Sequence, residues 1–177
     1  MESFNHKLKQ ITFKTFYRNQ MATFDYDNLF ANRRVLVFSI TNSYTRCTGV
    51  QIKNFELNYQ HLLNLGLDDI YVVDSVDWLV GPMMDKKKTD IKGLPDRDQS
   101  FIGAVSEYAG RTEDLKELSP WWQYMIIINN GEPEKLWSSP FKKNTSLYVR
   151  KNFDLRYRGL TVEQVEKYLL DNKQTNK

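Results

Sequence analysis

The sequence of 177 residues has a single cysteine, Cys47, and only two histidines, His6 and His61. One cysteine excludes an internal disulfide and any cysteine-rich metal site. The two isolated histidines offer too few ligands for zinc. We therefore expect no metal and no cofactor. A lone cysteine also fits a reducing compartment, where structural disulfides are rare.

Long apolar runs and an excess of one charge are also missing. No stretch approaches the ~20 apolar residues of a membrane span, and the N-terminus lacks the apolar centre of a signal peptide. The net charge of +3 is too small to indicate nucleic-acid binding by itself. No glycine-rich phosphate loop and no Ser/His/Asp set is present. We expect a soluble cytoplasmic protein that binds neither membrane nor nucleic acid.

The composition is that of a globular chain, with 41% hydrophobic and 27% charged residues. A chain of this length is most simply one domain. We expect a single domain over 1–177, with its core at about 11–172 and frayed polar termini.

Hydrophobic patterning predicts a mixed α/β domain. An alternating N-terminal region predicts a β-hairpin from strands at 11–17 and 21–26. Nearly continuous apolar runs predict buried strands, and stripes at helical spacing predict helices. The buried strands are expected at 35–40, 69–74 and 124–128, and the longer helices at about 47–65, 76–86, 98–110 and 161–171. The helix between the first two buried strands makes these strands parallel. The order predicts a central mixed sheet with helices on both faces.

Cys47 lies between the first buried strand and the first long helix, after the polar stretch 41–46. At a helix N-terminus, free N–H groups and the macrodipole favour the thiolate over the thiol. This position predicts a redox-type α/β domain.

Several segments, in this order and spacing, resemble the type-five peroxiredoxins of the alkyl hydroperoxide reductase and thiol-specific antioxidant superfamily. The resemblance covers about 11–172 and is carried by 11–15, 27–39, 65–73, 94–96, 122–124 and 168–170. It implies a thioredoxin-like fold with an N-terminal β-hairpin. It also implies that Cys47 attacks hydrogen peroxide or an alkyl hydroperoxide and becomes a sulfenic acid. With no second cysteine, the resemblance implies reduction by an external thiol, such as glutathione or a thioredoxin-type donor. The family further implies a homo-oligomer.

The chain departs from the family around its cysteine. The shielding proline of the family is Thr41 here. Thr45 lies two residues before Cys47 rather than three, and Tyr44 takes the usual distance of the threonine. Arg46 is adjacent in sequence and is a candidate source of positive charge.

Two further positions near the cysteine are neutral amides. The arginine that the family brings from its third buried strand is Gln123, just before Tyr124. The histidine four residues after the cysteine is Gln51. The resemblance therefore implies a site made of Cys47, Thr45, Tyr44, Arg46 and Gln123.

The segment 140–160 is longer than in the family. It interleaves basic residues with aromatic ones, namely Lys142, Lys143, Arg150, Lys151, Arg156 and Arg158 with Phe141, Tyr148, Phe153 and Tyr157. This basic insertion is a solvated surface excursion, a protein contact or a phosphate-binding surface. Together with the altered site, it supports a second hypothesis, in which the fold is kept, the chemistry is lost, and the domain is a subunit of a larger assembly.

Overall fold

The computed structural model describes residues 3–40, 46–75, 79–111, 114, 122–139, 148–151, 154–157 and 160–175. The helices are α1 (Phe4–Leu8), α2 (Tyr26–Leu29), α3 (Arg46–Asn64), α4 (Val80–Lys87), α5 (Ser100–Tyr108) and α7 (Val162–Thr175). The strands are β1 (Phe13–Tyr17), β2 (Gln20–Phe24), β3 (Arg34–Ile40), β4 (Asp69–Asp74), β5 (Lys92–Pro95), β6 (Tyr124–Asn129), β7 (Glu132–Ser138), β8 (Tyr148–Lys151) and β9 (Asp154–Tyr157).

A five-stranded sheet forms the centre of the molecule, with the order β5-β4-β3-β6-β7. Strands β3, β4 and β5 are parallel, whereas β6 and β7 run antiparallel to their neighbours. The α/β class, the mixed sheet and the parallel pair around α3 are therefore confirmed. The N-terminal hairpin is confirmed as well, with Phe13 paired to Phe24.

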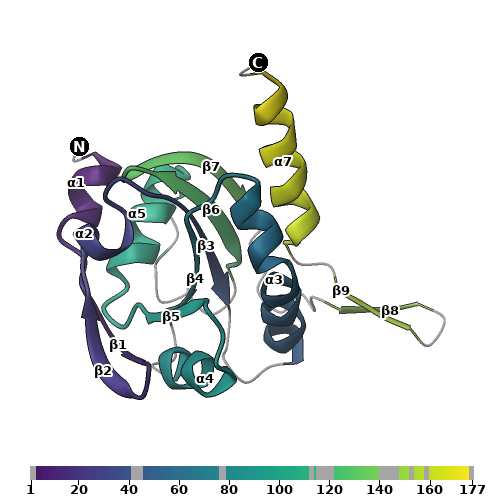
Figure 1. The fold of residues 1–177 in the computed structure, drawn as a ribbon, viewed down its shortest axis with the longest axis horizontal. Helices are drawn as coiled ribbons and strands as arrows, with labels where there is room; N and C mark the ends of the chain where they lie inside the picture. The colour runs from purple at the N-terminus through teal and green to yellow at the C-terminus, as the bar shows by residue number, and fades with distance from the viewer. Residues whose placement is uncertain are drawn as a thin grey trace.

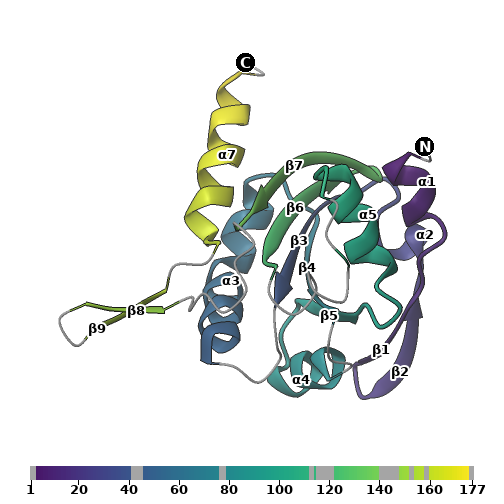
Figure 2. The same ribbon diagram turned by 180° about the vertical axis from the view of Figure 1, so that it is seen from behind.

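Both faces of the sheet are covered, and this explains why its inner strands are apolar throughout. Helices α1, α2 and α5 pack on one face, and α3 and α7 on the other (Figure 1). The view from behind shows the same division (Figure 2). All residues of β3 from Val35 to Ile40 are buried.

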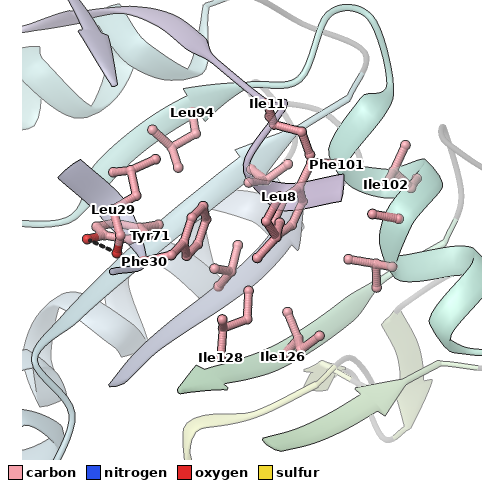
Figure 3. Packing of buried hydrophobic residues seen from close by; sticks show 14 of the residues in the cluster. Leu8, Ile11, Leu29, Phe30, Tyr71, Leu94, Phe101, Ile102, Ile126 and Ile128 are labelled. Carbon is pink, nitrogen blue, oxygen red and sulfur yellow. Dashed lines mark hydrogen bonds between the residues drawn. The ribbon is translucent and has the colours of Figure 1, made fainter. Parts of the chain in front are cut away.

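Aromatic rings pack among aliphatic side chains in the core cluster under α2 and α5 (Figure 3). The rings of Phe30 and Phe101 stack with centroids 6.1 Å apart. The hydroxyl of Tyr71 donates a hydrogen bond to the carbonyl of Leu29 at 3.2 Å. Such contacts attach the short helix α2 to the buried strand β4.

Helix α1 was not expected from the sequence. It is only five residues long, too short to show a periodic stripe. The side chain of Ser3 caps it by accepting from the His6 N–H, and Phe4 and Leu8 lie in the core. The core therefore begins before the predicted boundary at residue 11.

Helix α4 begins at Val80, later than predicted, and the predicted residues 76–78 lie outside the described ranges. Gly81 and Pro82 consequently fall in its first turn. Proline is tolerated there because the N–H that it lacks has no partner within the helix. These two residues therefore do not interrupt the hydrogen bonds of the helix.

Helix α5 is held at its N-terminus by Asp96 rather than by Asp98. The carboxylate of Asp96 accepts from the backbone N–H groups of Phe101 and Ile102 at 3.0 and 2.8 Å. Asp98 accepts instead from Ser100.

The basic insertion contains an antiparallel hairpin, β8–β9, in which Tyr148 pairs with Tyr157. In both ribbon views this hairpin extends away from the sheet and its helices (Figures 1 and 2). These two strands were not predicted from the sequence. Among the described residues, no helix is both long and apolar enough to cross a bilayer.

Candidate functional site

Cys47 is the second residue of α3, at the end of the sheet to which β3 leads. Of Arg46 and Cys47 the structure describes the backbone. The predicted partners Tyr44 and Thr45, and the proline position Thr41, lie outside the described residues. Their roles therefore stay predictions.

Packing against the sheet fixes the orientation of α3. Its buried residues Thr48, Gln51, Ile52 and Phe55 follow one another at helical spacing. The ring of Phe55 stacks on Phe38 of β3, with centroids 4.3 Å apart. Residues four apart are separated by about one helical turn, so the backbone of Cys47 lies one turn before that of Gln51.

A serine at the end of β3 holds the start of β6 in place. The Ser39 Oγ accepts a hydrogen bond from the Tyr124 N–H at 2.8 Å. The antiparallel register pairs Phe38 with Met125, and its continuation sets Gln123 opposite Ile40. Gln123 therefore lies opposite the last residue of β3, at the end of the strand from which the chain continues toward Cys47.

The side chain of Gln123 contacts α3. Its Nε2 donates to the Oε1 of Gln51 at 3.5 Å, a long hydrogen bond. Both side chains are only 1% exposed. The structure thus brings one predicted site residue, Gln123, to the helix that carries Cys47, and the group that it contacts there is a second neutral amide.

No protein-family model matches the chain. The chain is 28% identical over 137 residues to the hybrid peroxiredoxin hyPrx5 of Haemophilus influenzae, and the match covers 76% of this chain. Reduced Prx3 of Vibrio vulnificus, solved in complex with H2O2, superposes with a TM-score of 0.68 at 20% identity, covering 96% of this chain and 99% of that one. The chain is related to the peroxiredoxins and has their fold.

A second solved peroxiredoxin supports the same fold. The 1-Cys peroxiredoxin of Plasmodium falciparum matches with a TM-score of 0.62 at 20% identity, over 88% of each chain. The family resemblance read from the sequence is confirmed by these matches. The chain spans 56% of the length of hyPrx5, so the activity of that whole protein is not carried over to it.

The sequence did not indicate one positively charged residue near this end of the central sheet, Arg111. The guanidinium carbon of Arg111 lies 4.9 Å from the ring centroid of Trp122, and its Nη2 donates to the Ser139 carbonyl at 3.4 Å. Because side chains alternate along a strand, Trp122 and Gln123 point to opposite faces. Arg111 therefore lies on the face opposite Gln51. No periodic spacing in the sequence indicates the contact of Arg111 with Trp122, since the two residues do not lie in the same helix or strand.

Asp96 is another buried ionisable group at the same end of the sheet, and it is 1% exposed. Burial raises the pKa of its carboxyl, although the N–H groups of Ile102 and Phe101 oppose the shift. These bonds identify Asp96 as the cap of α5. Within the described ranges, no three His, Cys, Asp or Glu side chains form a group that could hold a metal ion.

Proposed function

We propose that this chain is a thiol peroxidase that reduces hydrogen peroxide or alkyl hydroperoxides through Cys47 alone. The observation that carries the proposal is the position of Cys47 at the N-terminus of α3, directly after β3, in a peroxiredoxin fold. The unpaired N–H groups of the first helical turn favour a thiolate there. The relatives named as peroxiredoxins support the reaction class.

The proposed reaction begins with the thiolate sulfur attacking one peroxide oxygen. The S–O bond forms as the O–O bond breaks, so that the sulfur is oxidised to a sulfenic acid and the peroxide is reduced. The departing oxygen takes up a proton and leaves as water or an alcohol. Thr45 or Tyr44 would supply a hydroxyl that orients the sulfur and peroxide, and Arg46 and Gln123 would be its polar neighbours.

Since the chain has no second cysteine, the proposed cycle ends with an external thiol, such as glutathione or a thioredoxin-type donor. The first external thiol condenses with the sulfenic acid, forming a mixed disulfide and water. A second thiol then attacks this disulfide and restores the Cys47 thiol. We propose that the chain does this in the cytoplasm, as a homo-oligomer or within a protein assembly.

One observation favours a second function, in which the chemistry is lost and the domain is an interaction subunit. A two-stranded hairpin is marginally stable by itself in water, yet β8–β9 extends away from the sheet (Figure 1). Its segment is rich in arginine and tyrosine, which are enriched at protein interfaces. A binding partner would stabilise such an arm.

The rate of Cys47 oxidation separates the two functions. Sulfenic acid formation is followed by intact mass with a sulfenic-acid trap, using hydrogen peroxide and an alkyl hydroperoxide, with Cys47→Ser as the control. For a peroxidase we expect a rate at least about a thousandfold above that of a free thiol, the size of effect that fixed donors supply. A rate equal to that of an ordinary thiol would overturn the peroxidase proposal and leave the interaction subunit as the better one.

A further inference from the structure

A cavity of about 410 Å³ lies beside the N-terminal hairpin, and the proposed reaction makes no use of it. Its walls come from β1 and β2, from the first turn of α4, and from the end of β5 with the loop that follows. It therefore lies toward the carboxyl ends of the parallel strands β4 and β5, where open α/β sheets commonly bind ligands. Small-molecule sites measure about 300–1,000 Å³, so the cavity is large enough for an organic ligand.

Close packing of the hairpin on β5 and α4 fixes the walls of the cavity. The hydroxyl of the buried Thr15 donates to the Gly93 carbonyl at 2.6 Å. A Cβ on Gly81 would collide with the Thr15 side chain and approach the backbone of Phe16, so α4 and β1 touch there. Both ribbon views show the hairpin beside α4 and β5 (Figures 1 and 2). A ligand would therefore enter a pre-formed space, and less ordering would accompany its binding.

One part of the cavity is apolar. Phe16 of β1 pairs with Met21 of β2, so their side chains lie on the same face of the hairpin. Pro82 and Pro95 line the cavity from α4 and β5. Met21 is 70% exposed, and a flexible methionine on the surface can adapt its shape to an apolar ligand. This part of the cavity favours an alkyl chain.

The same cavity has an excess of positive charge. Lys14 and Arg97 both line it and are both exposed, and no ion pair among the described residues includes either of them. Asp98 lines the cavity as well, but its carboxylate already accepts from the N–H and the hydroxyl of Ser100. Lys14 is two residues from Phe16 on β1, so the two share one face of the strand. The positive charge thus adjoins the apolar part.

We propose that this cavity binds an alkyl carboxylate. The carboxylate lies between Lys14 and Arg97, which supply the charge that it needs. The alkyl chain lies against Phe16, Met21 and Pro82. An uncharged chain would leave both cations without a partner, and a short carboxylate would leave the apolar part empty, so the ligand needs both features. Of the described residues around the cavity, none belongs to α3, so binding does not depend on the reactivity of Cys47.

Isothermal titration calorimetry with sodium decanoate, kept below its micelle concentration, tests the proposal. Lys14→Glu combined with Arg97→Glu reverses both charges, and the fold should tolerate these changes because both side chains are exposed. Lys53→Glu combined with Lys167→Glu is the matched control, since these two exposed lysines lie outside the cavity, on α3 and α7. Decan-1-ol offers the chain without the charge, and acetate offers the charge without the chain. Circular dichroism confirms that each variant is folded.

We expect the parent protein to bind decanoate saturably. The cavity variant should bind it at least about tenfold more weakly, because two attractions become repulsions, and the control variant should keep the parent affinity. Decan-1-ol should bind several times more weakly than decanoate and should not respond to the charge reversal, and acetate should not bind. A parent protein that does not bind decanoate, or a folded cavity variant that binds it as tightly as the parent, would overturn the proposal.

The variant Cys47→Ser separates this site from the proposed reaction. It should bind decanoate as the parent does, and a folded Cys47→Ser variant that no longer binds would place the ligand at the thiol and overturn the proposed cavity. If the parent protein binds decanoate but reacts with peroxide no faster than an ordinary thiol, the ligand site stands and the peroxidase proposal fails. If it reacts fast without binding decanoate, the peroxidase proposal stands and the ligand site fails.

Discussion

At the residue scale, the proposed chemistry depends on how strongly the surroundings of Cys47 favour the thiolate. A helix N-terminus contributes about 0.3–1 kcal/mol to a nearby negative charge. One pKa unit corresponds to about 1.4 kcal/mol, so an effect of this size is equivalent to less than one pKa unit. A neighbouring guanidinium would lower the thiol pKa by about 1–3 units. Gln51 and Gln123 are neutral amides, so neither supplies the positive charge that this larger effect requires.

Installing the charge should therefore increase the reactivity of the thiol. We predict that Gln123→Arg lowers the pKa of Cys47 by about one unit or more, by attraction between the guanidinium and the thiolate. The pH dependence of iodoacetamide alkylation measures the shift. Gln123→Met, of similar length but uncharged, controls for the loss of the amide. A folded Gln123→Arg variant with the pKa of the parent protein would contradict the prediction.

The site could be predicted from the sequence only where its residues belong to a regular element. Gln123 could be assigned because it directly precedes an apolar strand, and Gln51 because it follows Cys47 by one helical turn. Arg111 could not be found in this way. Its contact with Trp122 joins the end of α5 to the start of β6, and nothing in the local spacing specifies that meeting.

At the scale of elements, the predictions succeeded where burial imposes a pattern. Strands β3, β4 and β6 are covered on both faces, and their continuous apolar runs identified them. Helix α1 has too few residues for a stripe. The hairpin β8–β9 was not predicted, because its sequence mixes basic and aromatic residues and lacks the apolar pattern of a buried strand.

Two glycines in regular elements should respond in opposite ways to an added methyl group. Gly49 lies in α3 with no heavy atom within 4 Å of a Cβ, whereas a Cβ on Gly93 in β5 would lie 2.4 Å from the carbonyl oxygen of Val80. We predict that Gly49→Ala stabilises the fold by about 0.5–1 kcal/mol, since alanine loses less backbone entropy in a helix.

Gly93→Ala should destabilise the fold by about 1–3 kcal/mol, because the backbone of α4 must move away from β5. Urea unfolding of both variants beside the parent protein measures the two changes in free energy. Equal effects of the two alanines would show that the close approach of α4 and β5 does not limit the residue at position 93.

At the scale of the whole molecule, one acidic residue ties three elements together. The Glu134 carboxylate of β7 accepts two hydrogen bonds from the Arg34 guanidinium of β3, one of them 2.9 Å long. It also accepts from the Tyr168 hydroxyl of α7 at 3.1 Å. The C-terminal helix is thereby joined to the edge strand and to the central strand of the sheet. Because these contacts depend on the charge of the Glu134 carboxylate, the attachment of α7 to the sheet should depend on pH.

The pKa of Glu134 gives the direction of that dependence. Burial raises the pKa, but the hydrogen bonds and charge of Arg34 outweigh it and lower the pKa below its usual 4.5. A carboxyl with a lowered folded-state pKa stabilises the fold above the unfolded-state pKa, and the stabilisation is lost as pH falls through the folded-state pKa. The contribution of Glu134 is therefore full at neutral pH and disappears in acid, below about pH 4.5.

We predict that Glu134→Gln lowers the free energy of unfolding by about 2 kcal/mol at pH 7, the size of a lost charged hydrogen bond. The difference from the parent protein should shrink as pH falls below about 4.5, since the parent then loses the same interaction. Urea unfolding across this pH range measures it. Glu163→Gln on the exposed side of α7 serves as the control and should change stability little at any pH. A Glu134→Gln deficit that stays constant into acid would mean that packing, rather than the charge of Glu134, holds α7 to the sheet.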